Sequence, residues 1–208
     1  MRGGRHTWPW LESHGNPFVT EIQVFPSTYF NIVRSLTMII LMSHLIVLRG
    51  PTRAGKSSIA TEFCNQLGFR NLDIDGLADE LRSETHAANL SYEDILREAY
   101  EKLAACFNKG SSVVLQEAFA QEHVDVLTSI VIGPLKQRFD TETIVFFICC
   151  PLSLALERNR QSGQPLKEDV VRDQHNRFPE TDNFGYKIDT SSVNPKEAVD
   201  IIKKQLGL

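Results

Sequence analysis

Short apolar runs alternate with amphipathic stretches from residue 44 to the end of the chain. A strand in a parallel sheet is covered on both faces, so its sequence is a continuous apolar run and not an alternating one. Three segments fit this description, at residues 45–48, 113–115 and 144–148, and two further segments with fewer apolar residues, 69–74 and 186–188, also suit a short strand. We predict that each of them forms a β-strand.

Between these runs, apolar side chains recur every three or four positions, which is the period of a helix buried along one face. Ser91 followed by Asp94 is the signature of a capping box, and Pro195 suits the first position of another helix. Gly133-Pro134 should kink or divide the helix around it, because proline lacks a backbone donor. The predicted helices cover residues 57–67, 76–82, 91–107, 124–139, 169–178 and 195–206, with one more beginning at 151 and a polar loop over 159–167.

Alternating strands and helices indicate an α/β fold. We predict a parallel five-stranded sheet with helices on both faces. Ligands of such sheets bind at the carboxyl ends of the strands, so candidate site residues are expected just after each strand. A chain of 208 residues is long enough for one domain of this kind and some additional sequence.

Residues 1–43 differ from the rest, since they scatter aromatic residues and prolines without any period. An apolar run over 32–48 could pass for a membrane span or a signal sequence. Arg34, Ser43 and His44 interrupt it, and its second half is needed as the first strand. We therefore divide the chain into an irregular N-terminal extension, 1–43, and a domain, 44–208. The extension is a tail, a targeting peptide or the product of an upstream start codon, with Met42 or Met38 as the alternative start.

The formal net charge of −4 argues against a general nucleic-acid coat protein, although a local basic groove is compatible with it. None of the four cysteines has the spacing of a zinc site, and the neighbouring Cys149 and Cys150 would point to opposite faces of a strand. We expect reduced, mostly buried thiols in a cytoplasmic protein without a membrane partner. Four histidines are expected to be structural or exposed: His44, His86, His123 and His175.

Residues 50–57 match the phosphate-binding pattern G-x-x-x-x-G-K-[ST], between an apolar strand and an amphipathic helix. Its glycines let backbone N–H groups converge on phosphate oxygens, and the helix N-terminus adds positive potential. Lys56 should reach the β- and γ-phosphates, and the Ser57 hydroxyl should ligate magnesium. The pattern predicts a P-loop NTPase fold that binds ATP and Mg²⁺. The predicted binding residues are Gly50, Pro51, Thr52, Arg53, Ala54, Gly55, Lys56, Ser57 and Ser58.

Kinases, ATPases and GTPases all use such a loop. The segment 73–76 has the D-x-x-G form of a GTPase switch, but it follows the first helix too soon. The chain also contains no N-K-x-D motif to read guanine. A GTPase is therefore disfavoured, and a nucleotide-hydrolysing ATPase or switch that acts through a partner is the alternative to a kinase.

Several segments together resemble the P-loop kinases grouped around polynucleotide 5′-kinase, chloramphenicol phosphotransferase and zeta toxin. The resemblance covers residues 44–208 and is carried by 50–58, 72–75, 113–117, 148–160 and 174–179. It implies an ATP-dependent kinase that transfers the γ-phosphoryl group to a hydroxyl. The acceptor, a small molecule or a nucleic-acid end, is not identified, with nucleic acid less favoured, and the oligomeric state is left open.

The resemblance also implies roles for two acidic positions. Asp75 matches the aspartate that accepts the proton of the attacking hydroxyl, with Asp73 as the rival, while a helix cap is the structural alternative for Asp75. Glu117, at the end of the third strand, matches a carboxylate placed near magnesium or the acceptor. We therefore predict Asp75 as the base, and Ser57 with Glu117 as the metal site.

Arginines that close over the phosphates as a lid are implied by the same resemblance. Arg158 and Arg160 are expected to follow the helix after the fourth strand and to take this catalytic role, because a guanidinium binds phosphate oxygens in a bidentate manner. Their spacing is shorter than the R-x-x-R of many members. Three further cations are candidates for the acceptor side: Lys167, Arg172 and Arg177.

Overall fold

The computed structural model describes residues 43–85, 90–118, 123–139, 141–178 and 184–208 of the chain. The predicted N-terminal extension, apart from residue 43, lies outside the described residues, and so does His86.

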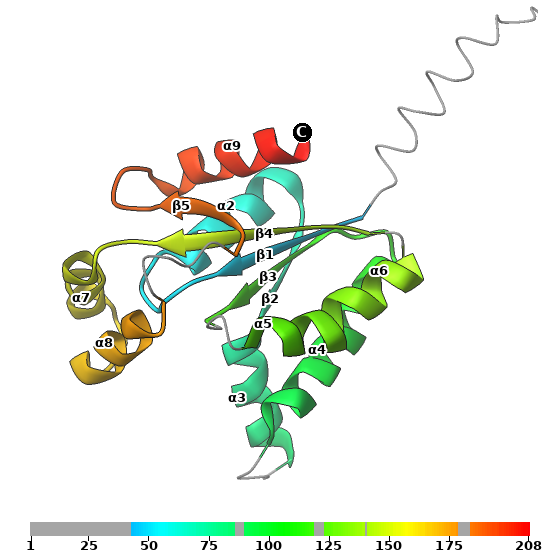
Figure 1. Cartoon of the computed structure of the whole chain (residues 1–208), viewed down its shortest axis with the longest axis horizontal. Coiled ribbons are helices and arrows are strands. Elements are labelled where there is room, and N and C mark those ends of the chain that lie inside the picture. The colour runs from blue at the N-terminus through cyan, green and yellow to red at the C-terminus, as the bar shows by residue number, and fades with distance from the viewer. Residues whose placement is uncertain (1–42, 86–89, 119–122, 140, 179–183) are drawn as a thin grey trace, which may run out of the picture. The chain divides into compact units, whose positions relative to one another are not determined.

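Five parallel strands form one sheet in the order β2-β3-β1-β4-β5 (Figure 1). This confirms the predicted α/β fold with a parallel five-stranded sheet. The bounds of each strand lie within two residues of the segment that predicted it. The strands are β1 (His44–Arg49), β2 (Arg70–Asp73), β3 (Val113–Glu117), β4 (Glu142–Cys149) and β5 (Tyr186–Asp189).

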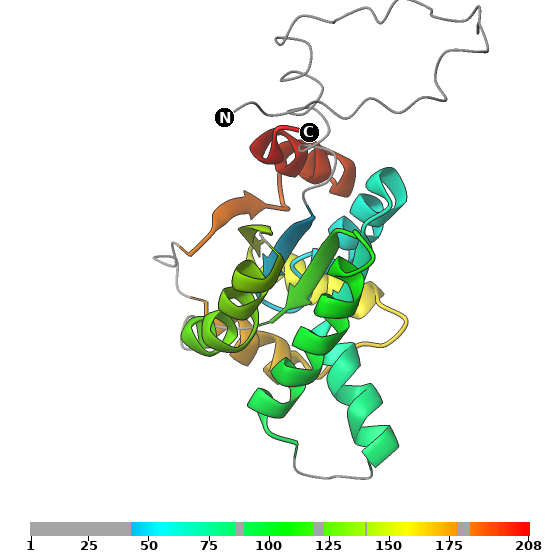
Figure 2. The same cartoon turned by 90° about the vertical axis from the view of Figure 1, so that its right-hand side faces the viewer.

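Helices cover both faces of the sheet, as the alternation predicted (Figures 1 and 2). Side chains of β1 alternate between the two layers: Leu45 and Val47 pack on one side, Ile46 and Leu48 on the other. All four are fully buried. The first side carries α3 (Ile74–Thr85), α4 (Tyr92–Phe107) and the helical segment from 124 to 139, and the second carries α2 (Lys56–Leu67) and α9 (Pro195–Leu206).

Caps and breaks in the helices follow the local sequence closely. Ser91 and Asp94 form the predicted capping box of α4, and Asn194 with Glu197 forms another at α9. The segment 124–139 is divided as expected, although π-helical turns precede Gly133 in place of a simple kink. Its parts are α5 (Val124–Leu127), the π-helical stretch η2 (Thr128–Ile132) and α6 (Gly133–Phe139).

Two helices lie beyond the carboxyl ends of the strands, α7 (Leu152–Gln161) and α8 (Glu168–Asn176) (Figure 1). The predicted loop at 159–167 was too long at its start, since α7 continues to Gln161. Arg158 and Arg160 therefore lie in the last turn of α7 and do not follow it, which corrects the sequence prediction. A polar helix end of this kind has no apolar period to reveal it.

The expectation that the cysteines are mostly buried needs correction, whereas a buried His44 agrees with a structural role. All four cysteines are free thiols, but each is half-buried and not buried. His44 is buried beside Glu142, with 3.3 Å between Nδ1 and Oε2, whereas His175 contacts the phosphate-binding loop. Within the described part of the chain, no helix is long and apolar enough to cross a membrane.

Candidate active site

The candidate site lies where the strand order reverses. The chain leaves β1 at the centre of the sheet, and its neighbours β3 and β4 continue on opposite sides. Such a switch point leaves a crevice beyond the carboxyl ends of the strands. The phosphate-binding loop, residues 50–55, occupies this position and leads directly into α2.

The glycines of the loop are required by its backbone path. Gly50 has φ +141°, and a Cβ there would lie 2.0 Å from the Ile148 carbonyl oxygen of β4. Gly55 has φ +104° at the N-cap of α2, and no side chain caps that helix end. The N–H groups of the first turn of α2 are therefore available to an anion, as the motif predicted.

Lys56 folds back over this loop. Its Nζ donates to the carbonyl oxygens of Gly50 at 2.7 Å and Pro51 at 3.0 Å. Enclosure of the ammonium lowers the pKa of Lys56 to about 8, against the opposing effect of the carboxylates of Asp75 and Glu117. The lysine thus lies between the loop and a group of acidic side chains.

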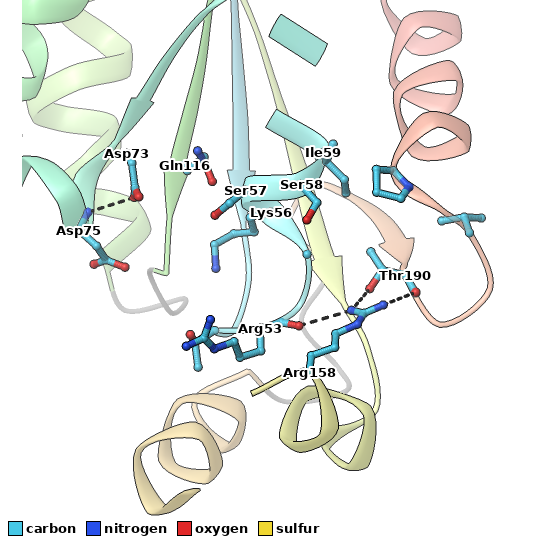
Figure 3. A pocket seen from close by; sticks show the side chains of 14 residues that line it. Arg53, Lys56, Ser57, Ser58, Ile59, Asp73, Asp75, Gln116, Arg158 and Thr190 are labelled. Carbon is cyan, nitrogen blue, oxygen red and sulfur yellow. Dashed lines mark hydrogen bonds between the residues drawn. The ribbon is translucent and has the colours of Figure 1, made fainter. Parts of the chain in front are cut away.

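A cavity of about 500 Å³ opens over the loop (Figure 3). Acidic and amide side chains from the ends of β2 and β3 line one part of it, and the 190–195 segment lines another. Its lining residues are Thr52, Arg53, Gly55, Lys56, Ser57, Ser58, Ile59, Asp73, Asp75, Gln116, Arg158, Thr190, Val193 and Pro195.

Asp73 and Asp75 have different structural positions. Helix α3 begins at Ile74, so Asp75 lies in its first turn and is not its cap, which corrects that alternative. Asp73 takes the capping position, because its Oδ1 accepts from the Asp75 N–H at 3.3 Å. Burial and the neighbouring Asp75 raise the pKa of Asp73. The Asp75 side chain is exposed and points toward the cavity (Figure 3).

Glu117 lies on a second cavity of about 350 Å³ between β3, α3 and α4. Only 6% of Glu117 is exposed, and burial together with Asp75 raises its pKa to about 8. Ser57 lines the first cavity and Glu117 the second, so the two predicted metal ligands open on different spaces. Asp75 is the one described residue that lines both cavities.

Arg158 is fixed against the loop by several hydrogen bonds. Its Nη1 donates to Thr190 Oγ1 at 2.9 Å and its Nη2 to the Thr190 carbonyl at 2.8 Å (Figure 3). Thr190 Oγ1 in turn donates to the Ala54 carbonyl at 2.7 Å. The guanidinium is therefore held at the edge of the first cavity.

The other predicted cations lie elsewhere. Arg160 is exposed and pairs with Glu168 at 3.0 Å, so the structure brings only Arg158 of the two arginines to the cavity. Three candidates for the acceptor side are exposed and line neither cavity: Lys167, Arg172 and Arg177.

Sequence reasoning missed several residues that shape the site. Asn159 is buried and accepts from Arg53 Nε at 3.0 Å, and His175 Nε2 lies 3.2 Å from the Thr52 carbonyl oxygen. Gln116 is buried beside the first cavity. Its position directly before Glu117 at a strand end was the available signal, whereas Asn159 in a polar stretch carried none.

Arg49 was also missed, although it directly precedes the loop. The residue is fully buried, and its guanidinium lies 5.0–5.5 Å from the ring centroids of Phe147, Phe178 and Phe184. Its Nη1 donates to the Phe184 carbonyl at 3.0 Å. This cation–π cluster joins the end of β1 to the segments that follow α8 and precede β5.

The donor set fits a magnesium ion held mainly by phosphates. Among the described residues, no group of three or more histidine, cysteine or acidic side chains is placed to hold a metal. Magnesium commonly uses one or two protein ligands, with phosphate oxygens and water for the rest. The Ser57 hydroxyl, exposed in the first cavity, is suited to this role.

Comparison with known protein families agrees with the geometry. The model of the chloramphenicol phosphotransferase-like proteins matches residues 43–207. The chain belongs to the chloramphenicol phosphotransferase-like family. This membership confirms the predicted family group and agrees with the predicted phosphotransferase class.

One curated relative is the L-seryl-tRNA(Sec) kinase of Methanococcus maripaludis, 26% identical over 161 residues. The match covers 75% of this chain, which spans only about three-fifths (61%) of that relative. Among solved structures, the Deinococcus radiodurans tunicamycin resistance protein is similar with a TM-score of 0.59 and 22% identity, over 80% of this chain and 96% of that one. The Mycobacterium tuberculosis APS kinase, in complex with AMPPNP and APS, has a TM-score of 0.57 and 16% identity, over 80% and 99%. These likenesses confirm the P-loop kinase fold.

Proposed function

We propose that this chain is an ATP-dependent kinase that transfers the γ-phosphoryl group to a hydroxyl of a small-molecule acceptor. The observation that carries the proposal is the position of Asp75, which lines both the cavity over the phosphate-binding loop and the second cavity beside it. A base for phosphoryl transfer has to stand between the donor and the acceptor. Asp73 lines only the first cavity and caps α3, so it suits the role less well.

The first cavity is suited to ATP along its whole length. Lys56 and the N-terminus of α2 would bind the β- and γ-phosphates, and Ser57 would hold Mg²⁺, which neutralises phosphate charge when bound. Arg158 would contact the phosphates from the side of α7. Val193 and Pro195 offer an apolar wall for the nucleoside at the far part of the cavity.

In the proposed reaction the acceptor hydroxyl oxygen attacks the γ-phosphorus, and the bond from that phosphorus to the bridging oxygen of ADP breaks. Asp75 takes the hydroxyl proton as the new P–O bond forms, and ADP leaves with the bridging oxygen. Lys56 stabilises the charge that develops on the transferred group. Little further chemistry is required of the protein.

A nucleic-acid end is the second candidate acceptor, and the similarity to L-seryl-tRNA(Sec) kinase is the observation in its favour. The net charge of −4 weighs against it, because phosphate-backbone contacts need clustered cations. A partner-dependent ATPase remains the alternative of a different class. The cytoplasmic location stays a prediction, with the free thiols in its support.

The test compares Asp75→Asn with Asp73→Asn in an assay of ATP-dependent phosphorylation. We expect Asp75→Asn to lower transfer by roughly 10²–10⁴-fold, the usual contribution of a general base, while ATP affinity stays near normal. Asp73→Asn should be milder, because asparagine can still cap α3. Lys56→Ala should abolish transfer and weaken ATP binding. If both aspartate variants keep full activity, the kinase mechanism is wrong and the ATPase alternative takes its place.

A further inference from the structure

The second cavity has a mixed lining. Ile74, Ala78 and Ile95 supply buried apolar walls from α3 and α4, and acidic and other polar side chains complete the lining. Its volume of about 350 Å³ falls at the small end of the range for ligand pockets, roughly 300–1,000 Å³. Asp75, at the wall shared with the ATP cavity, places the proposed base within reach of any ligand held there.

Glu117 and Tyr92 both line this cavity, and each has a buried polar atom, Oε2 and Oη respectively, with no hydrogen-bond partner among the described residues. The Ala118 N–H hydrogen-bonds to the Glu117 carboxylate, but Oε2 stays unpaired. The pKa of Tyr92 is raised by burial and by Glu117, so its hydroxyl stays protonated and able to donate. Glu117 thus lies close enough to Tyr92 to affect the titration of its hydroxyl.

Leaving buried polar atoms unpaired is costly for the folded protein, about 1–3 kcal/mol for each group. Native structures contain few of them, and each calls for a physical explanation. Glu117 and Tyr92 belong to different elements, β3 and α4, yet both line one cavity beside the proposed base. A ligand that hydrogen-bonds to both residues would remove this cost. A solely structural role of Glu117 and Tyr92 would leave the two unpaired atoms unexplained.

The charges around the cavity restrict what that ligand can be. Arg82 is the single cation among the described lining residues, and its Nη1 is paired with Asp79 at 3.0 Å. Asp75 and Glu117 remain as carboxyl groups facing the space. A carboxylate or phosphate on the ligand would therefore be repelled by Asp75 without a free cation to offset it.

We propose that this cavity binds the phosphate acceptor, and that the acceptor is a small uncharged or cationic alcohol with an apolar body. A second polar group of the acceptor hydrogen-bonds to Tyr92 and Glu117, which act as specificity-determining residues, while its reacting hydroxyl faces Asp75. Glu117 is thereby assigned to the acceptor and not to magnesium. This assignment rests on the proposed kinase function.

The test uses a size-matched panel of uncharged diols, amino alcohols, hydroxy acids and alcohols that carry a phosphate, each with ATP and Mg²⁺. Product is detected by mass spectrometry, with Lys56→Ala as the blank. The preferred alcohol is then titrated on the wild type, Tyr92→Phe and Tyr100→Phe. Tyr100 is a matched control, because it lies on the same helix and its hydroxyl accepts from Arg138 at 3.5 Å, outside the cavity.

We expect phosphorylated product from uncharged or amino alcohols only. Tyr92→Phe should raise KM for the acceptor roughly 3–10-fold, the effect of one lost hydrogen bond, and Tyr100→Phe should leave it unchanged. Preference for anionic acceptors, or equal effects of the two tyrosine variants, would overturn the acceptor assignment while Lys56-dependent transfer leaves the kinase proposal intact. Absence of product from every class would overturn both.

Discussion

At the scale of single residues, Lys56 links the phosphate-binding loop to the acidic side of the site. Its ammonium bonds two loop carbonyls, and Asp75, Glu117 and Asp73 all lie close enough to favour its charged form. Enclosure nevertheless dominates and lowers its pKa to about 8. The Lys56 ammonium, which would contact the phosphates, therefore loses its proton only near the upper end of the physiological pH range.

This pKa makes a prediction for ATP use. Lys56 is protonated below pH 8, so kcat/KM for ATP should be level near pH 7 and fall by up to about tenfold per pH unit above pH 8. At saturating ATP the phosphates stabilise the ammonium, so kcat should fall only at higher pH. Initial rates from pH 6.5 to 10 measure both profiles. A level kcat/KM up to pH 10 would contradict the assigned role of the lysine.

Glu117 gives a second residue-scale prediction, this time for stability. Burial and Asp75 raise its pKa from 4.5 to about 8, so between these values the folded chain holds a proton that the unfolded chain has lost. Stability from this group is complete below pH 4.5 and is lost as the pH rises to 8. Glu117→Gln removes the dependence and should melt above the wild type by a margin that grows from pH 5 to pH 8.

The size of this difference in Tm between Glu117→Gln and the wild type follows from the usual relation of about 2–4 °C for each kcal/mol in a chain of this size. Thermal melts monitored by circular dichroism at several pH values provide the measurement. Glu101→Gln, at an exposed position of α4, serves as the control and should show no such pH dependence. If the difference in Tm between the variant and the wild type shrinks as the pH rises, the charged Glu117 carboxylate does not destabilise the folded protein.

At the scale of elements, helix α7 and the loop after it are joined to the phosphate-binding loop through Asn159. Asn159 Oδ1 accepts from Arg53 Nε at 3.0 Å and from the Leu166 N–H at 2.9 Å, and its Nδ2 donates to the Leu166 carbonyl at 2.8 Å. Arg53 also donates to the Gln164 carbonyl. One buried amide therefore fixes both the 162–167 loop and a residue of the nucleotide site.

Asn159→Ala should remove the hydrogen bonds that join α7 and the 162–167 loop to the phosphate-binding loop. Leu166 and Arg53 would lose their partner, at a cost of about 1–3 kcal/mol for buried groups, and KM for ATP should rise as Arg53 loses its position. Urea unfolding and initial-rate kinetics provide the two measurements. Gln161→Ala, two residues later on the exposed face of α7, is the control and should change neither. Equal effects of the two variants on stability and on KM would mean that Asn159 contributes only to helix α7 and does not hold the phosphate-binding loop.

At the scale of the whole molecule, we expect the domain that carries the site to begin close to residue 43. The family match starts there, and the first strand follows at His44. We expect a chain that begins at Met42 to fold and bind ATP with the affinity of the full chain. Calorimetric titration with an ATP analogue checks this. If the shortened chain is insoluble while the full chain is not, residues 1–41 belong to the domain.

Sequence alone was a good guide to the parts of the fold that local pattern controls. The five predicted strands all form, and the Ser91–Asp94 capping box and Pro195 correctly located two helix starts. Errors fell where local pattern is ambiguous. Asp73 and Asp75 are both suitable caps, and the helix start at Ile74 decided between them. The end of α7 is polar and has no repeat of apolar positions, so the sequence did not show that the helix continues to Gln161.

By itself, the sequence determined the phosphate-binding loop, the parallel sheet and the family, because a contiguous motif and the period of apolar positions encode them. Only the tertiary structure decided that Arg158 and not Arg160 reaches the site, that Asp75 alone among the described residues lines both cavities, and that Glu117 faces the second one. The physical reason is distance along the chain. Arg158 Nη1 donates to the carbonyls of Arg53 and Ala54, more than 100 residues earlier in the chain, and no local period records such a contact.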